Sequence, residues 1–174
     1  MRMSAGRNFS AKLITKIKAI NQKLTQENLK ICCAESCTGG LLSGLFTEIE
    51  GSSKIFDRGF VVYSNQSKID LLNVDKNLLE EFGAVSEEVA LAMARGALKN
   101  SKADIAIAIT GIAGPTGATL DKQVGTIFIA IISKNFSQIE KFIFGKNRNQ
   151  NRNLTLENSL IILENFIKKN DQIK

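Results

Sequence analysis

The chain has 174 residues, 44% of them hydrophobic and 23% charged, a balance typical of one globular domain rather than a disordered chain. It contains no histidine, which excludes Ser-His-Asp triads, Cys-His pairs and histidine-ligated metal sites and leaves acid–base chemistry to Lys, Tyr, Cys or carboxylates. The net charge is +6, but its basic residues gather in residues 1–30 and 145–174, which we interpret as solvated helix faces rather than a nucleic-acid-binding surface.

Apolar segments alternate with polar and glycine-rich ones along the first half of the chain. The four-, three- and four-residue spacing of Leu13, Ile17, Ile20 and Leu24 predicts one amphipathic helix. In chain order we then expect a strand at 29–34, a turn at 36–40, a helix at 41–49, a strand at 56–63 and a helix capped by Ser64 or Asn65 that runs to Leu72.

The second half continues the alternation. Carboxylates in the first turn favour a helix that starts at 86–89, and residues 103–110 alternate isoleucine with alanine, which predicts a central strand apolar on both faces. Further strands are expected at 124–132 and 138–144, and a closing helix through 156–167. Connections that contain helices predict an α/β fold, a single-domain three-layer α/β/α sandwich over residues 1–174 with frayed ends at 1–9 and 168–174.

Three cysteines, Cys32, Cys33 and Cys37, lie within six residues. Their odd number and tight spacing do not fit a disulfide framework and argue for a reducing compartment, hence a cytoplasmic protein. Three cysteines without histidine also fail the four-ligand rule for structural zinc, so no metal is expected. We therefore predict buried thiols that pack as small apolar side chains. The N-terminus shows no secretory signal, and no apolar run approaches the roughly 20 residues of a membrane-spanning helix.

Polar segments follow three of the expected strands, where open α/β sheets place their sites. In 35–40, Ser36 is either a nucleophile in a tight turn or only a helix cap. In 63–68, Lys68 is either a base made neutral by burial or a surface lysine. The glycine-rich loop 110–117 lacks the Gly-Lys-Ser/Thr of a phosphate-binding P-loop, and Thr110 is expected to point into the crevice or merely to begin a connection.

Together these segments resemble the CinA carboxy-terminal family, the competence/damage-inducible or nicotinamide-nucleotide amidase family. The matching motifs are AESCTGGL at 34–41, GSS at 51–53, RGFVVYSN at 58–65 with Lys68, GAVSE at 83–87, AIAITGIAGP at 106–115 and VGT at 124–126. The resemblance covers about residues 10 to 167 and implies an amidase that converts nicotinamide mononucleotide (NMN) to nicotinate mononucleotide and ammonia, without a cofactor.

The resemblance also implies residue roles. Ser36 matches the nucleophile, Lys68 the general base and Tyr63 the residue that supports this pair. The positions expected to contact the nucleotide substrate are Thr38, Gly39, Gly40, Arg58, Thr110, Gly111 and Arg148. The amides of 38–40 would hold either the oxyanion or the phosphate, and Arg58 or Arg148 would neutralise the phosphate. The resemblance further suggests a homodimer and a stand-alone form of the family.

Some positions depart from the family pattern. Glu50 replaces a proline before GSS, residues 116–123 have fewer glycines and prolines, and Lys146 and Asn147 stand where the family has glycine and aspartate before the arginine. These changes affect substrate recognition more than the Ser-Tyr-Lys chemistry. Two alternative functions are a non-catalytic module that binds a nucleotide or another phosphorylated ligand, and an accessory protein in competence or the DNA damage response.

Overall fold

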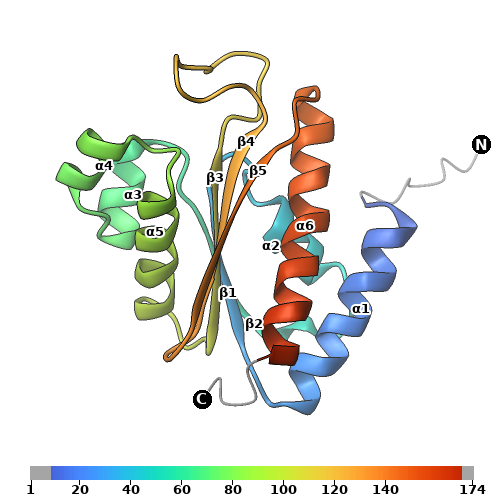
Figure 1. Cartoon of the computed structure of the whole chain (residues 1–174). Coiled ribbons are helices and arrows are strands. Elements are labelled where there is room, and N and C mark those ends of the chain that lie inside the picture. The colour runs from blue at the N-terminus through green and yellow to red at the C-terminus, as the bar shows by residue number, and fades with distance from the viewer. Residues whose placement is uncertain (1–8, 170–174) are drawn as a thin grey trace, which may run out of the picture.

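The apolar segments form one mixed five-stranded sheet in the computed structural model, which describes residues 9–169 (Figure 1). The strands are β1 (Ile31–Glu35), β2 (Phe56–Val61), β3 (Ile105–Gly111), β4 (Thr126–Ile132) and β5 (Ser137–Ile143). Their order in the sheet is β2-β1-β3-β4-β5. β1 pairs in parallel with β2 and β3, whereas β4 is antiparallel to both of its neighbours.

Helices cover both faces of the sheet. They are α1 (Ala11–Gln26), α2 (Leu41–Thr47), the short 3-10 helix η1 (Ser52–Lys54), α3 (Asn65–Leu72), α4 (Lys76–Phe82), α5 (Glu87–Lys99) and α6 (Arg148–Lys169). Figure 1 shows α3, α4 and α5 on one side of the sheet and α1, α2 and α6 on the other. The predicted α/β class with three layers is confirmed.

The central strand β3 shows why both faces are covered. Ile105, Ile107 and Ile109 belong to the core on the α1–α2–α6 side, whereas Ala106 and Ala108 belong to the core on the α5 side. The alanines leave room for α5, whose inner face is itself rich in alanine. The predicted alternation of a bulky and a small face is therefore confirmed.

Several element bounds differ from the sequence-based expectations. The helix α4 and the 3-10 helix were not predicted, and α6 begins at Arg148, well before the expected stripe. Residues 1–8 and 170–174 of the expected frayed ends lie outside the described residues. Of the remainder, Phe9 packs against the core, and Lys168 and Lys169 lie in the last turn of α6.

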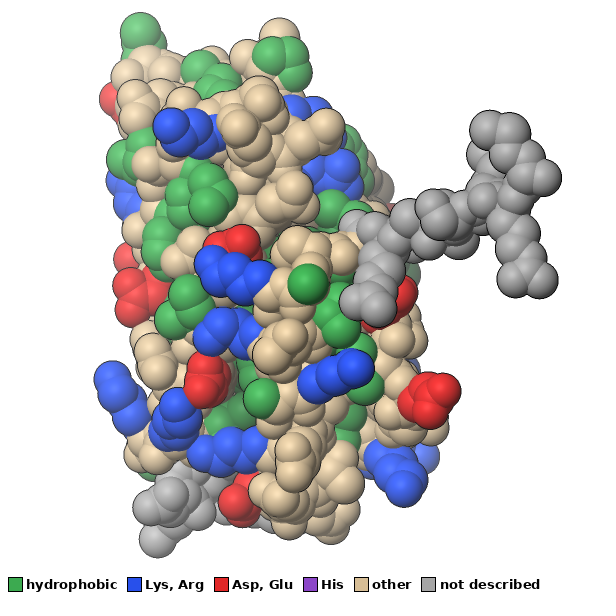
Figure 2. All heavy atoms as spheres, turned by 90° about the vertical axis from the view of Figure 1, so that its right-hand side faces the viewer, with side chains coloured by type: hydrophobic (Ala, Val, Ile, Leu, Met, Phe, Trp, Pro, Cys, Tyr) green, Lys and Arg blue, Asp and Glu red, His purple; other side chains and the backbone are tan. Residues whose placement is uncertain are grey.

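The face formed by α1 and α6 carries basic and acidic side chains interspersed with apolar ones (Figure 2). Lys12 and Lys16 of α1 pair with Glu157 and Glu164 of α6 at 2.8 and 2.9 Å. Beneath these pairs, the predicted stripe of α1 is buried against α6. No helix in residues 9–169 is both long and apolar enough to cross a membrane.

Candidate active site

The turn that follows β1 places Ser36 at the carboxyl edge of the sheet. The Ser36 N–H donates to the Ile109 carbonyl at 3.0 Å and so continues the pairing of β1 with β3. Gly39 and Gly40 then adopt positive φ angles of 61° and 92°, a conformation that costs glycine little and other residues more. The chain can therefore reverse direction between Ser36 and the start of α2 at Leu41.

Lys68 reaches the same place from α3. It lies one turn into this helix, whose N-cap is Ser64, and helical side chains lean toward the N-terminus of their helix. Its amine therefore folds back over the chain that follows β2. The Lys68 Nζ lies 3.0 Å from the Val62 carbonyl, 3.2 Å from the Tyr63 carbonyl and 3.2 Å from Ser36 Oγ.

The Ser36–Lys68 pair is shielded from bulk solvent. Lys68 is 1% exposed and Ser36 8% exposed. Burial lowers the pKa of the Lys68 amine from its ordinary value of 10.5, against a smaller opposing effect of the Cys37 thiol. A lysine with a lowered pKa next to a serine hydroxyl is the arrangement that activates a serine without histidine.

A cavity of about 310 Å³ opens over this pair, within the lower range of ligand sites. Its lining includes Ser36, Tyr63, Lys68, Thr110, Gly111 and Arg148. The structure therefore brings together six of the ten expected site residues. They come from the turn after β1, the β2–α3 connection, α3, β3 and α6.

The cavity mouth combines an aromatic ring with a cation. Tyr63 is 62% exposed, and its hydroxyl lies 3.5 Å from Nη2 of Arg148. Arg148 also donates through Nη1 to the Gly114 carbonyl at 2.9 Å. Tyr63 thus contacts Lys68 through its main-chain carbonyl, and its hydroxyl faces Arg148 instead.

Thr110, predicted to point into the crevice, lines the cavity and is 1% exposed. Its hydroxyl donates to the Ala84 carbonyl at 2.6 Å. Because that bond uses the only hydrogen of the hydroxyl, its lone pairs can accept a hydrogen bond from a ligand. Thr110 is therefore suited to an N–H or O–H donor on the ligand.

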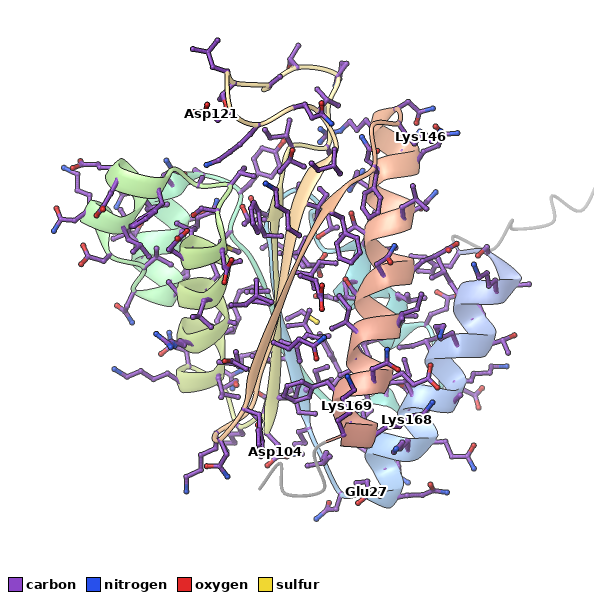
Figure 3. The ribbon with its side chains drawn as sticks, in the orientation of Figure 1. Glu27, Asp104, Asp121, Lys146, Lys168 and Lys169 are labelled. Carbon is purple, nitrogen blue, oxygen red and sulfur yellow. The ribbon has the colours of Figure 1, made fainter. Side chains whose placement is uncertain are left out.

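Arg58 is not part of this cavity. Its side chain donates to Asp57 at 2.7 Å and to the Asn100 carbonyl at 2.9 Å, where the chain leaves α5. Figure 3 labels Asp104 near this connection, at the edge of the sheet opposite the one with Lys146. Arg58 therefore lies near the end of the sheet away from the cavity. Of the two arginines expected to bind the phosphate, only Arg148 lines the cavity.

Of the amides of residues 38–40, which were expected to hold the oxyanion or the phosphate, those of Gly39 and Gly40 are bonded within the protein instead. The Gly40 N–H donates to the Glu35 carboxylate at 3.1 Å, and the Gly39 N–H donates to the Ser36 carbonyl at 3.1 Å. Thr38 is fully buried, and its hydroxyl has no partner within the described residues. Gly39 and Gly40 therefore shape the turn, and their amides are already occupied within the protein.

Glu35 is a residue of this region whose role sequence reasoning missed. It is fully buried and accepts hydrogen bonds from the N–H groups of Gly40, Leu42 and Ser43 and from the Ser43 hydroxyl, at 2.7 to 3.1 Å. A carboxylate suits the positive end of a helix. The signal in the sequence was a single acidic residue directly after an apolar strand and before a glycine-rich turn.

Two asparagines near the start of α6 were also missed. The Asn147 side chain accepts from the Gln150 N–H at 3.0 Å, so asparagine caps α6 where the family has aspartate. Asn151 is fully buried and donates to the carbonyls of Ala113 and Lys146 at 3.0 and 2.7 Å. These bonds fix the loop after β3 to the helix that carries Arg148.

The three thiols are free and buried, as predicted. Burial raises the pKa of Cys32 to about 11 and that of Cys37 to about 12, and it raises that of Cys33 well above its ordinary value. Because the thiolate is the reactive form, Cys37 is a poor nucleophile although it adjoins Ser36. Within residues 9–169, no cluster of three or more His, Cys, Asp or Glu side chains could hold a metal ion.

Fold and site together define a three-layer α/β/α domain with a buried Ser–Lys pair at the carboxyl edge of its parallel strands. The profile of the CinA C-terminal domain family matches residues 14–167. The chain belongs to this family.

Its relatives carry competence-related names. A putative competence-damage inducible protein of Caldicellulosiruptor saccharolyticus is 50% identical over 131 residues, which are 75% of this chain and 32% of that protein. A CinA-like protein of Syntrophobacter fumaroxidans is 44% identical over 146 residues, 84% of this chain and 34% of that protein. The chain thus spans about a third of the length of these curated relatives.

Solved structures share the fold over nearly the whole chain. The competence/damage inducible protein CihA of Agrobacterium tumefaciens is 40% identical with a TM-score of 0.87, covering 94% of this chain and 97% of that one. A CinA superfamily protein of Escherichia coli is 32% identical with a TM-score of 0.85, covering 93% and 98%. These similarities extend through both helical layers and the sheet.

Proposed function

We propose that this protein hydrolyses the carboxamide of nicotinamide mononucleotide to the carboxylate and ammonia, with Ser36 as nucleophile and Lys68 as general base. The observation that carries the proposal is the 3.2 Å separation of Ser36 Oγ and Lys68 Nζ at the floor of a cavity. The family resemblance supplies the substrate, a nucleotide with one amide and one phosphate. Arg148 at the same cavity supplies a cation for the phosphate.

The reaction begins with neutral Lys68. Its lone pair accepts the Ser36 proton while Ser36 Oγ attacks the carboxamide carbon. The ammonium that forms is stabilised by the carbonyls of Val62 and Tyr63, which already lie at hydrogen-bonding distance. Because Ser36 and Lys68 are in direct contact, the proton needs no relay through the Tyr63 hydroxyl.

The tetrahedral intermediate then collapses toward ammonia. The oxyanion requires hydrogen-bond donors, each contributing about 3 kcal/mol, other than the Gly39 and Gly40 amides, which are bonded within the protein. Protonated Lys68 gives its proton to the leaving nitrogen as the C–N bond breaks, leaving an acyl group on Ser36. A water molecule deprotonated by Lys68 attacks this ester, and Ser36 regains its proton as the carboxylate product leaves.

Replacement of the nucleophile tests the proposal. Ser36→Ala removes the attacking oxygen, so kcat for ammonia release from nicotinamide mononucleotide should fall at least about 1,000-fold. The matched control is Cys37→Ala, which removes the neighbouring thiol and should retain turnover. Far-UV circular dichroism of both variants should match the unaltered protein.

Three outcomes would count against this proposal. Turnover that survives in Ser36→Ala contradicts Ser36 as the nucleophile. Binding of nicotinamide mononucleotide in calorimetry without ammonia from the unaltered protein would identify a ligand-binding module, which the cavity and Arg148 also suit. DNA binding with a steep salt dependence would favour the accessory role in competence or DNA damage.

A further inference from the structure

Two arginines, Arg148 and Arg152, lie one turn apart on α6 and do different things. Arg148 lines the cavity. Arg152 is half-buried and donates through Nη2 to the Thr38 carbonyl at 2.7 Å. Thr38 is in the turn that begins with Ser36, so Arg152 joins α6 directly to the segment that carries the nucleophile.

Arg152 is not explained by an ion pair. None of the salt bridges of residues 9–169 includes it, and its Nε is buried without a hydrogen-bond partner. Burial of part of this cation costs desolvation, which its hydrogen bond to the Thr38 carbonyl helps to offset. Burial raises the pKa of the Cys37 thiol, and the positive charge of Arg152 opposes part of this rise. The charge of Arg152 is therefore felt within the turn.

The Ser36 turn, residues 36–40, is held from two sides. Glu35 binds the N–H groups at its end and at the start of α2. Arg152 binds its carbonyl side, next to Gly39. Between these contacts the turn contains two glycines with positive φ, which have the greatest freedom to move.

We propose that Arg152 is a positioning residue, which fixes the Ser36 turn against α6 and so determines the placement of the Ser36 hydroxyl. The inference rests on the proposed amidase. Lys68 is held separately by the Val62 and Tyr63 carbonyls, so the Ser36–Lys68 distance depends on how firmly the turn is held. An error of about 1 Å in such a pair lowers a rate by about 100-fold.

Paired arginine variants and paired substrates separate positioning from binding. Arg152→Met keeps the aliphatic stem and should lower kcat about 10- to 100-fold, with KM within about threefold. The same loss should appear with nicotinamide mononucleotide and with its phosphate-free nucleoside. Arg148→Met should instead raise KM about tenfold or more for the nucleotide and raise KM for the nucleoside less. Arg152→Lys should restore part of kcat, because an ammonium can still donate to the Thr38 carbonyl.

The opposite patterns would overturn the proposal. If Arg152→Met raises KM only for the phosphorylated substrate, Arg152 is a phosphate ligand instead. If Arg152→Met leaves kcat unchanged for both substrates, the contact with Thr38 does not position Ser36. Unchanged melting temperatures would show that neither result comes from unfolding.

Hydrogen exchange provides a readout that does not require turnover. Arg152→Met should speed amide exchange in residues 36–41, whereas Arg95→Met, an exposed arginine on α5, should not. Unchanged exchange in Arg152→Met would refute the positioning role even if the protein proves to be an amidase. Faster exchange in a protein that releases no ammonia would refute the amidase and retain the link between α6 and the turn.

Discussion

The nitrogen of Lys68 has contacts that serve both of its protonation states. As an amine it can accept the Ser36 proton, and as an ammonium it can donate to the carbonyls of Val62 and Tyr63. Desolvation favours the amine, and the carbonyls favour the ammonium. The catalytic proposal requires the amine in the resting enzyme, since a protonated lysine has no lone pair for the serine proton.

The rate should therefore rise with pH at constant substrate. Because the pKa of Lys68 is lowered from 10.5, kcat/KM for ammonia release should increase about tenfold per pH unit below that lowered pKa and level off above it. A pH profile of kcat/KM checks this. Lys68→Arg, which stays protonated at every accessible pH, should be inactive throughout. A profile of kcat/KM without a rising limb, flat from acidic to alkaline pH, would contradict the general-base role.

The residues with reactive groups were the predictable part of the site. Ser36, Lys68 and Thr110 directly follow apolar strands or a strand–helix connection, and the sheet gathers such positions at one edge. Arg58 was misplaced because it lies inside β2, three residues before the strand ends at Val61, and its side chain contacts the end of α5 instead of the cavity. Arg152 was missed because its importance lies in a hydrogen bond to a backbone atom of the Ser36 turn, which no residue pattern encodes. The role of Glu35 was indicated only by its place between an apolar strand and a glycine-rich turn.

Among the elements, those with strong periodicity were predicted and short ones were not. The stripe of α1 and the isoleucine–alanine alternation of β3 are long enough to indicate their type. The helix α4 has only seven residues, and its start depends on the Asp75 side chain, which accepts from the Asn77 N–H at 2.8 Å. The N-terminal turns of α6 are rich in asparagine, a poor helix former, and are held instead by contacts with the loop after β3.

The packing of α5 against α3 provides a prediction at this scale. A Cβ at Gly96 of α5 would overlap the carbonyl oxygen of Leu72, the last residue of α3. Gly96→Ala should therefore lower the free energy of unfolding by about 1–3 kcal/mol. It should also lower kcat, since α3 carries Lys68. Urea unfolding and the ammonia assay measure the two effects.

The matched control is Gly44→Ala in α2, another helical glycine. A Cβ there would meet only the Phe9 ring at 3.7 Å, an ordinary contact. Alanine favours a helix over glycine by up to about 1 kcal/mol, so this variant should be as stable as the unaltered protein or more so. Equal destabilisation by both substitutions would mean that the Leu72 contact is not the cause.

For the whole molecule, strand directions follow from the connections. Parallel strands need a long crossover, usually a helix, and helices do separate β1, β2 and β3 along the chain. The segment 112–125 contains no helix, and only four residues join β4 to β5, so both of these pairs are antiparallel. The position of β1 between β2 and β3 depends on packing between distant segments, which the sequence pattern does not reveal.

The same topology makes the site depend on the entire fold. Ser36 follows β1, Lys68 lies in the layer of α3–α5, Thr110 ends β3 and Arg148 begins α6 in the opposite layer. Both layers pack on the same strands, with one core on each face of the sheet. Because the two cores share these strands, we expect the domain to unfold cooperatively, and neither layer should detach while the other persists.

Activity and structure should accordingly disappear together. In a urea titration with saturating nicotinamide mononucleotide, the rate of ammonia release and the far-UV ellipticity should fall with one midpoint. Urea is itself an amide, so a parallel titration with guanidinium chloride distinguishes unfolding from competition at Ser36. Activity that vanishes in both denaturants while ellipticity remains would give the opposite result. The contacts of α6 with the Ser36 turn and with residues 113–114 would then open before the sheet unfolds. The site would be a locally unstable region instead of an integral part of the core.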